Sequence, residues 1–320
     1  MIRVQGIQEE HGIVGRDREL ALSLAVLARG GHLLLEGPVG VGKTTVALAV
    51  CGHLGKQTVR VDGDDRYSES KLTGWFDPPL VLKRGYSEES FFAGPLVRAM
   101  REGSVLFINE LNRMPESVQN VLLPALDERL VIVPHIGEVR AAEGFQVIAT
   151  QNPVEYIATG HLSEALRDRF EHVALEYQSA EEEARIVAAE TGSDDARLIV
   201  QAVAIARATR AHPALKKGAS IRAAIAVVTI AEELAAEGGL AGPPAAEAPD
   251  DASAPEGDAD LRLLRLAAGA ALPTRIELAG DADASLDTVI DEICTAVVAD
   301  ADAAVAAFAA ASAAARAKKD

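Results

Sequence analysis

Residues 37–44 read Gly37-Pro38-Val39-Gly40-Val41-Gly42-Lys43-Thr44, which is the spacing of a phosphate-binding P-loop. A triphosphate needs several backbone N–H groups from a loop without bulky side chains, with a helix N-terminus behind them. Gly40 and Gly42 let the backbone approach the phosphates. Lys43 can reach the β and γ phosphates, and the Thr44 hydroxyl suits a bound Mg²⁺ ion. The stretch therefore predicts a nucleotide site.

The sequence on both sides of this loop has the required order of strand, loop and helix. His32-Leu33-Leu34-Leu35-Glu36 reads as a short buried strand that enters the loop, and residues 43 to about 54 read as a helix that leaves it. Such a helix directs the positive end of its dipole at the phosphates. A glycine-rich turn after a strand can arise by chance, but the complete order favours a genuine nucleotide site.

Two residues outside the loop complete the predicted nucleotide contacts. Thr45 follows the loop on the predicted helix, and Val14 lies in the short apolar hook Gly12-Ile13-Val14-Gly15-Arg16. A helical stretch over residues 16–29 comes next. The hook either lies against the nucleotide base or packs on the core as an ordinary loop, and the sequence favours neither.

Five apolar segments read as strands that alternate with helical stretches. They are His32–Glu36, Thr58–Val61, Ser104–Ile108, Gly144–Thr150 and Glu171–Glu176. This alternation predicts an α/β fold, with a parallel sheet that carries crossover helices on both faces. Between the third and fourth strands, residues 130–141 read as a hairpin that projects from the sheet.

Composition and periodicity divide the chain into four segments. Residues 1–176 form the predicted nucleotide-binding domain, and residues 177–237, with apolar residues at helical spacing, form a smaller all-α domain. Residues 238–260 are rich in Ala, Pro, Gly and Asp and are predicted to be a disordered linker. Residues 261–320 read as Ala-rich, acidic helices whose thin apolar face packs on the body or on a partner.

Charge and composition exclude several classes of protein. The 320 residues carry 48 acidic and 31 basic side chains, for a net charge of −17, which argues against a nucleic-acid partner. No apolar run reaches the roughly 18 residues that span a bilayer, and there is no hydrophobic leader. Cys51 and Cys294 lie far apart in the sequence. We therefore expect a cytoplasmic protein with reduced thiols and no membrane segment.

Polar residues after the third and fourth predicted strands are the candidate hydrolytic groups. Glu110 is placed to polarise a water for attack on a γ-phosphate, unless it is a surface glutamate that starts a loop. Asn109 stands where most such ATPases have an aspartate that holds Mg²⁺. Asn152 can orient the attacking water, although Asn-Pro also commonly opens a turn.

Arg169 ends the helical stretch before the last predicted strand. Its guanidinium could point outward to the γ-phosphate of a neighbouring subunit, as planar cations do in phosphoryl transfer. The alternative is a surface arginine paired with Asp168.

Six stretches occur in a recognisable order. They are Gly37–Thr44, Gly94–Leu96, Asn109–Pro115, Ile148–Pro153, Leu162–Phe170 and Gly218–Ala223. In this order the chain resembles the AAA+ ATPases, and specifically the MoxR family, over residues 11 to about 236.

The resemblance implies a role for each matching residue. The lysine and hydroxyl residue of the P-loop would bind phosphate and Mg²⁺, and Glu110 would be the catalytic glutamate. Asn152 matches sensor 1. Arg169 matches the arginine finger that acts across a subunit interface, and Arg222 matches the sensor 2 arginine of the helical lid.

The resemblance also implies an assembly and a purpose. The family forms rings, commonly hexamers, and is similar to chaperone-like remodellers whose clients often carry a von Willebrand A domain. The leading hypothesis is therefore a Mg²⁺-dependent ATPase that remodels a partner protein from within a homo-oligomeric ring. This chain departs from the family pattern at Asn109 and at Ile221, where a proline is frequent. The alternative hypothesis is an ATP-binding switch or scaffold that hydrolyses little, because Asn109 replaces the usual aspartate.

Overall fold

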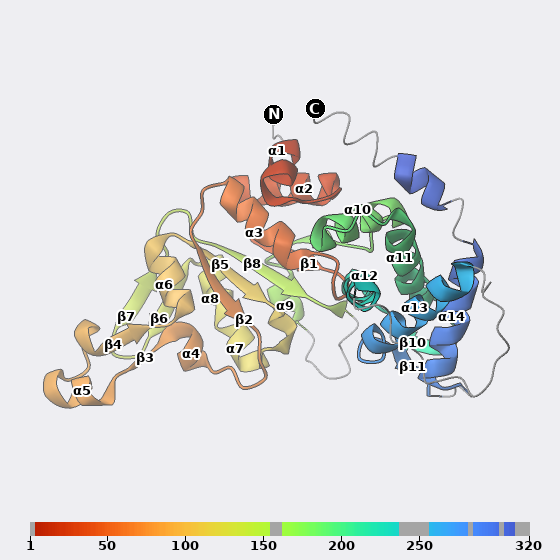
Figure 1. The fold of residues 1–320 in the computed structure, drawn as a ribbon. Helices are drawn as coiled ribbons and strands as arrows, with labels where there is room; N and C mark the ends of the chain where they lie inside the picture. The colour runs from red at the N-terminus through yellow and green to blue at the C-terminus, as the bar shows by residue number, and fades with distance from the viewer. Residues whose placement is uncertain (1–3, 154–161, 237–255, 281–283, 301–303, 311–320) are drawn as a thin grey trace. The chain divides into compact units, whose positions relative to one another are not determined.

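The computed structural model describes residues 4–153, 162–236, 256–280, 284–300 and 304–310. The chain forms two compact units, Met1–Tyr177 and Gln178–Asp320 (Figure 1). Each unit is described by itself.

The first unit is built on a five-stranded parallel sheet in the order β2-β5-β8-β1-β9. The strands are β1 (Leu33–Glu36), β2 (Thr58–Asp62), β5 (Val105–Asn109), β8 (Gln146–Gln151) and β9 (Glu171–Ala174). Each lies where the sequence predicts a strand, with its ends shifted by one or two residues. The predicted parallel α/β fold is confirmed, and β1, which enters the P-loop, lies between β8 and β9.

Two layers of helices cover the sheet. One layer contains α1 (Val4–His11), α2 (Asp17–Ala28) and α3 (Lys43–His53); the other contains α6 (Pro95–Glu102), α7 (Glu116–Asn120), α8 (Leu122–Asp127) and α9 (Glu164–Arg167). Successive side chains of a strand point to opposite faces. Val105 and Phe107 of β5 accordingly pack with the first layer, whereas Leu106 and Ile108 pack with the second. Helices therefore cover both faces, as predicted.

Two antiparallel hairpins are inserted into this sheet unit. The first insertion contains α4 (Glu69–Thr73), β3 (Gly74–Phe76), α5 (Pro78–Arg84), a 3-10 turn at Glu88–Ser90 and β4 (Phe91–Ala93), and β3 pairs with β4. The second insertion contains β6 (Leu130–Val133) and β7 (Gly137–Arg140), which pair with each other. The β6–β7 hairpin confirms the prediction for residues 130–141, whereas β3 and β4 were not predicted. The rings of Tyr86 and His135 stack with their centroids 4.1 Å apart, which joins the two insertions.

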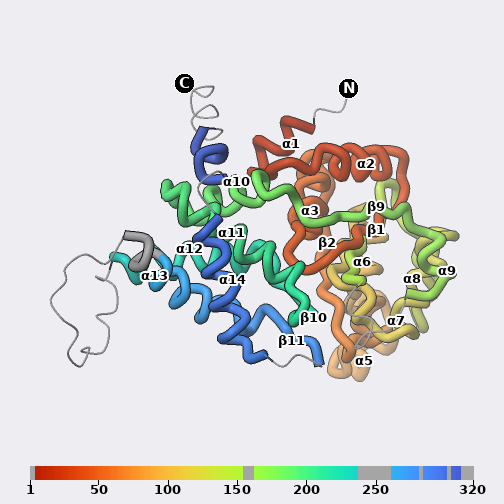
Figure 2. The backbone as a smooth tube through the Cα atoms, turned by 90° about the vertical axis from the view of Figure 1, so that its right-hand side faces the viewer, coloured from red at the N-terminus to blue at the C-terminus, as the bar shows by residue number. Residues whose placement is uncertain are grey.

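The second unit is helical, and Figure 2 shows its helices side by side. Its elements are α10 (Ala180–Thr191), α11 (Ala196–Ala211), β10 (Leu215–Lys217), α12 (Ile221–Ala236), α13 (Glu256–Ala271), β11 (Glu277–Leu278) and α14 (Leu286–Asp300). Val227 of α12, Leu264 of α13 and Ile290 of α14 are all buried in one core. The two C-terminal helices thus pack against the predicted lid helices.

The C-terminal region differs from the sequence prediction at one boundary. Most of the linker predicted over residues 238–260 lies outside the described residues, but α13 already begins at Glu256. The run from Glu256 to Ala271 contains no proline, so the helical pattern extends back to its first residue. Among the described helices, none alone is long and apolar enough to cross a membrane, although the bent pair Leu286–Asp300 and Ala304–Ala310 passes by length and composition.

A buried histidine next to β1 makes the stability of the fold depend on pH. The His32 Nδ1 accepts a hydrogen bond from the Val147 N–H at 2.9 Å, and burial, followed by the charge of Arg129, lowers the pKa of His32 from 6.5 to about 4. The unfolded chain therefore binds a proton at a higher pH than the folded chain does. We expect the free energy of unfolding to fall by about 3 kcal/mol as the pH drops from 6.5 to 4.

Urea unfolding at several pH values measures this slope, with His32→Asn as the reference variant. Asparagine keeps an acceptor for the Val147 N–H but has no group that titrates in this range. The variant should lose less stability than the wild type over the same pH interval, and equal slopes for the two proteins would contradict the prediction.

Candidate active site

The P-loop has the conformation that its glycines permit. Gly40 and Gly42 have φ angles of 82° and 88°, in the left-handed region, and α3 begins immediately afterwards at Lys43. A Cβ atom on Gly37 would lie 2.2 Å from the carbonyl oxygen of Leu175, so only glycine fits there. The loop therefore follows a path that presents its backbone at the start of a helix.

The functional side chains of the loop lie at this helix start. The Lys43 Nζ donates hydrogen bonds to the carbonyl oxygens of Gly37 and Pro38 at 2.6 and 2.7 Å. Thr44 is half-buried, Thr45 is exposed, and Val41 is buried in the core beneath the loop. The lysine ammonium is thus held within the loop that would surround a phosphate.

Asn109 is the centre of a polar network at the carboxyl edge of the sheet. Its Oδ1 accepts hydrogen bonds from the hydroxyls of Thr44 at 3.3 Å and Thr150 at 3.0 Å, and its Nδ2 donates to the Asp62 carboxylate at 3.0 Å. Hydrogen bonds from Arg60, and then from Asn109, lower the pKa of Asp62. The network therefore joins the P-loop helix to the ends of β2, β5 and β8.

Glu110 follows β5 with a left-handed backbone, at φ 57° and ψ 52°, which is uncommon for a residue other than glycine. Its N–H donates to the Thr150 hydroxyl at 2.8 Å, and its carboxylate accepts a hydrogen bond from Arg113 at 2.8 Å. The turn redirects the chain immediately after the last residue of the strand. The glutamate lies next to Asn109, and its side chain is 31% exposed, so a water molecule can reach it.

Gly63 brings the loop after β2 against the loop after β5. Its N–H donates to the carbonyl oxygen of Asn109 at 2.7 Å, and a Cβ atom at this position would lie 2.1 Å from the carbonyl oxygen of Glu110. The absence of a side chain at position 63 therefore allows the close contact of these two loops.

The third candidate at this edge is Asn152. It is buried and follows the last residue of β8, Gln151, whose amide donates to the Glu36 carboxylate at the end of β1. The structure thus brings the P-loop, Asn109, Glu110 and Asn152 to the same edge of the sheet, at the carboxyl ends of adjacent strands, where ligands bind in open α/β sheets.

Arg169 lies at the opposite edge of the sheet. It precedes β9, whose first residue, Glu171, is paired with Leu33 at the start of β1, whereas the P-loop follows the end of β1. The length of four strand residues, roughly 13 Å, separates the two positions. The guanidinium binds the Asp127 carboxylate, which raises the pKa of Arg169. The structure therefore does not bring Arg169 to the P-loop of its own chain, and its pairing partner is Asp127 rather than Asp168.

Arg222 belongs to the second unit. It is the second residue of α12 and is exposed. The preceding residues Gly218 and Ala219 are held close to α11, because the Ala219 N–H donates to the Thr209 hydroxyl at 2.8 Å. Arg222 therefore comes directly after a turn that is hydrogen-bonded to α11.

The hook before α2 contains a residue that the sequence analysis did not single out. Val14 is half-buried, but Arg16 is 8% exposed and donates to the carbonyl oxygens of Val41 at 2.9 Å and Glu176 at 2.7 Å. It also forms an ion pair with Glu19. An arginine in an otherwise apolar hook was the available signal, since a buried charge requires partners. Arg16 ties the P-loop to the end of the sheet unit.

The side chains at this edge suit one kind of metal. Among the described residues, no three His, Cys, Asp or Glu side chains form a cluster that could hold a metal ion by themselves. The available groups are the Thr44 hydroxyl and the Asn109 amide oxygen, with the Asp62 carboxylate hydrogen-bonded to the amide of Asn109. Such hard oxygen groups fit Mg²⁺, which binds through few protein ligands and the phosphates of its substrate.

Part of the chain matches a known protein family, and several known proteins are similar to it in sequence. Residues 32–170 match a family model described as an AAA domain of the dynein-related subfamily. The chain is 32% identical to protein NorQ of Paracoccus denitrificans over 183 residues, which are 57% of this chain and 66% of NorQ. It is 30% identical to an uncharacterised protein of Staphylococcus epidermidis over 200 residues, which are 61% of this chain and 75% of that protein.

A third relative carries an activity in its name. The gas vesicle ATPase GvpN of Ancylobacter aquaticus is 27% identical over 231 residues, which are 65% of this chain and 62% of GvpN. The chain thus spans slightly less than two thirds of the length of NorQ and of GvpN.

Proposed function

Because this chain is an AAA+ ATPase of the MoxR family, we propose that it hydrolyses Mg²⁺-ATP and uses the energy to remodel a partner protein from within a ring. The observation that carries the proposal is the meeting of Lys43, Thr44, Asn109 and Glu110 at one edge of the sheet. Phosphate-binding and water-activating groups are needed together for hydrolysis, and a site that only binds nucleotide needs no glutamate there.

Each residue has a distinct part in the proposed reaction. The backbone of residues 37–42 and the Lys43 ammonium hold the phosphates, and Glu110 accepts a proton from the water that attacks the γ-phosphate. Asn152 orients this water with its amide. Mg²⁺, when bound, neutralises charge on the phosphate oxygens. Thr44 and Asn109 are the residues that would hold the ion, and Thr45 and Val14 complete the nucleotide contacts.

The position of Arg169 supports a ring. Its guanidinium lies at the sheet edge opposite its own P-loop, so it can serve phosphoryl transfer only from a neighbouring subunit. We propose a homo-oligomeric ring, by family likeness a hexamer, in which Arg169 acts as the finger and Arg222 of the helical unit acts as the sensor 2 arginine.

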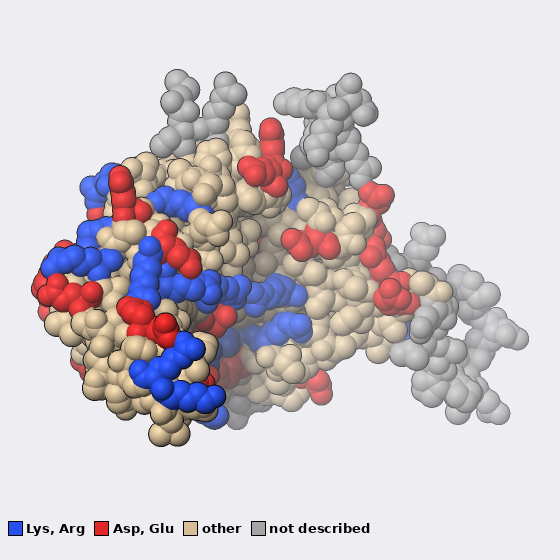
Figure 3. All heavy atoms as spheres, turned by 90° about the vertical axis from the view of Figure 1, so that its left-hand side faces the viewer, with Lys and Arg blue, Asp and Glu red and all other residues tan. Residues whose placement is uncertain are grey.

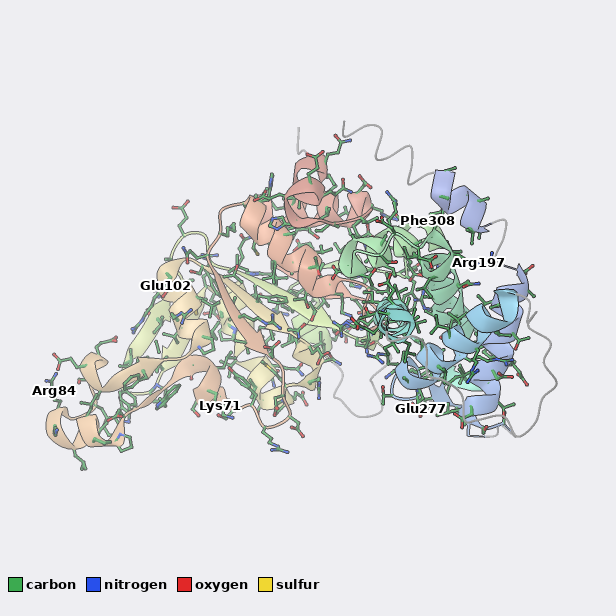
Figure 4. The ribbon with its side chains drawn as sticks, in the orientation of Figure 1. Lys71, Arg84, Glu102, Arg197, Glu277 and Phe308 are labelled. Carbon is green, nitrogen blue, oxygen red and sulfur yellow. The ribbon has the colours of Figure 1, made fainter. Side chains whose placement is uncertain are left out.

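The proposed client is a protein, by family likeness one with a von Willebrand A domain. Exposed apolar side chains on the two inserted hairpins support a protein partner: Trp75 and Phe92 stack at 6.0 Å with half of each exposed, and Leu82 and Ile132 are 89% and 72% exposed. Arg84 extends from the end of α5 (Figure 4). Figure 3 shows acidic and basic side chains intermixed on the face with α5, which offers no uniformly basic surface for nucleic acid.

The amide at position 109 favours a second function, in which the chain binds ATP but hydrolyses little of it. An amide brings no negative charge to the metal, so the chain could act as an ATP-binding switch or scaffold that hydrolyses little. Both functions use the same nucleotide site, and they differ in turnover.

Phosphate release from ATP separates the two functions. The purified full chain should release phosphate in the presence of Mg²⁺, and the rate per subunit should rise with protein concentration until assembly is complete, because Arg169 acts between subunits. Sedimentation at the same concentrations measures the assembly. ATP binding without phosphate release would support the switch, and a rate per subunit that is independent of assembly would contradict the ring.

A further inference from the structure

Asp62 is a carboxylate that sits one hydrogen bond away from the predicted metal site. It is the last residue of β2, and the parallel register of β2 and β5 pairs it directly with Asn109. Its Oδ1 accepts the Asn109 Nδ2 at 3.0 Å. The two residues at the ends of these neighbouring strands therefore form a carboxylate–amide pair, where the family pattern has a single aspartate.

The hydrogen bonds around Asn109 give its amide one orientation. On one side, the hydroxyls of Thr44 and Thr150 donate to its oxygen. On the other side, the Asp62 carboxylate can only accept, so it must face the NH₂ group. A reversed amide would place its oxygen against the carboxylate. Asp62 therefore directs the side-chain oxygen of Asn109 towards Thr44 of the P-loop helix.

We propose that Asp62 is a positioning residue for Mg²⁺, which acts through Asn109 and supplies the negative charge that the amide lacks. The proposal rests on the proposed function, since it concerns the metal of the same nucleotide site. The same oxygen of Asp62, Oδ1, also accepts a hydrogen bond from Arg60 at 2.9 Å, but both side chains of that pair are about half exposed, so water screens their attraction. The carboxylate accepts the hydrogen bond of the Asn109 Nδ2 and so polarises the amide.

Because Asp62 is paired with position 109, an aspartate at position 109 would face a second carboxylate. In Asn109→Asp, two carboxylates would face each other at paired positions of adjacent strands, and like charges there are destabilising. Restoring the usual aspartate alone should therefore not restore a normal metal site. Exchanging the two residues, in Asp62→Asn/Asn109→Asp, keeps one carboxylate and one amide in contact and places the charge next to Thr44.

The experiment measures binding of a fluorescent ATP analogue to the full chain as a function of Mg²⁺ concentration. Asp62→Asn should raise the Mg²⁺ concentration for half-maximal enhancement of binding roughly tenfold, as expected for loss of a charge-assisted hydrogen bond. The exchanged double variant should return this concentration to the wild-type value or below. Binding of the analogue without Mg²⁺, measured in EDTA, should be the same in all variants. Equal binding shows that the site is folded in each of them. Asp65→Asn, an exposed aspartate three residues further along, is the matched control.

The outcomes separate this inference from the proposed function. If the wild type does not bind the analogue, or binds it without any response to Mg²⁺, the proposed function itself fails. If the wild type responds and Asp62→Asn responds at the same concentration, the inference is overturned. It is also overturned if the exchanged variant, with wild-type binding in EDTA, is no better than Asp62→Asn.

Discussion

Replacing Arg169 by alanine is expected to lower ATP turnover by roughly 10³-fold or more, because an arginine finger contributes about 10³ to 10⁵ to phosphoryl transfer. ATP binding should be unchanged, since Arg169 lies at the sheet edge opposite the P-loop of its own chain. Phosphate release and nucleotide affinity, measured on the same preparation, test both parts. Arg167→Ala, which removes an exposed arginine of α9, is the control and should keep normal turnover.

A mixing experiment shows whether Arg169 acts between subunits. Arg169→Ala keeps its own P-loop but has no proposed finger, whereas Lys43→Ala keeps that arginine but loses the P-loop lysine that is proposed to hold the phosphates. Each variant should be inactive alone. In mixed rings, a Lys43→Ala subunit can present Arg169 to the intact site of its neighbour, so turnover should return on mixing. Continued inactivity of rings shown to contain both variants would contradict a role between subunits, and loss of the Asp127 ion pair alone would then explain Arg169→Ala.

Glu110→Gln is expected to lower turnover by roughly 10²- to 10⁴-fold, the usual contribution of a general base. Glutamine keeps the size of the side chain and an oxygen that can accept the hydrogen bond from Arg113, but it cannot take a proton from water. ATP affinity should be retained, so the variant should stay in the ATP-bound form and hold its client. Phosphate release, equilibrium ATP binding and co-purification with ATP measure these three properties.

The control for this variant is Glu116→Gln, at the start of α7, which removes one nearby negative charge outside the site. It should hydrolyse ATP at the wild-type rate. Turnover by Glu110→Gln at the wild-type rate would show that another group activates the water, and the proposed role of Glu110 would be wrong.

The sheet and the P-loop could be predicted because their signals are local. The apolar run Leu33–Leu35, the glycines of the loop and the helix that follows lie within about twenty residues, and each is typical of its element without reference to the rest of the chain. The same holds for the β6–β7 hairpin, where Gly137 marks the turn.

The pairing of Asp62 with Asn109 could not be predicted in this way. The two residues are 47 positions apart, and only the order and register of β2 and β5 bring them together. In the sequence, Asp62 reads as one of several acids in the polar stretch Asp62–Arg66, which is typical of an exposed loop. Arg16 was missed for a related reason, because its acceptors at Val41 and Glu176 are distant backbone carbonyls, which every residue has.

The contact at Gly63 limits how this sequence can vary. Any other residue there would bring its Cβ into the carbonyl of Glu110, so a substitution at position 63 requires the chain around residues 109–110 to follow a different path. The two loops must therefore change together over evolutionary time. In related sequences that retain the turn at Glu110, glycine at this position should be invariant, and a lineage with a larger residue there will have rebuilt this edge of its sheet.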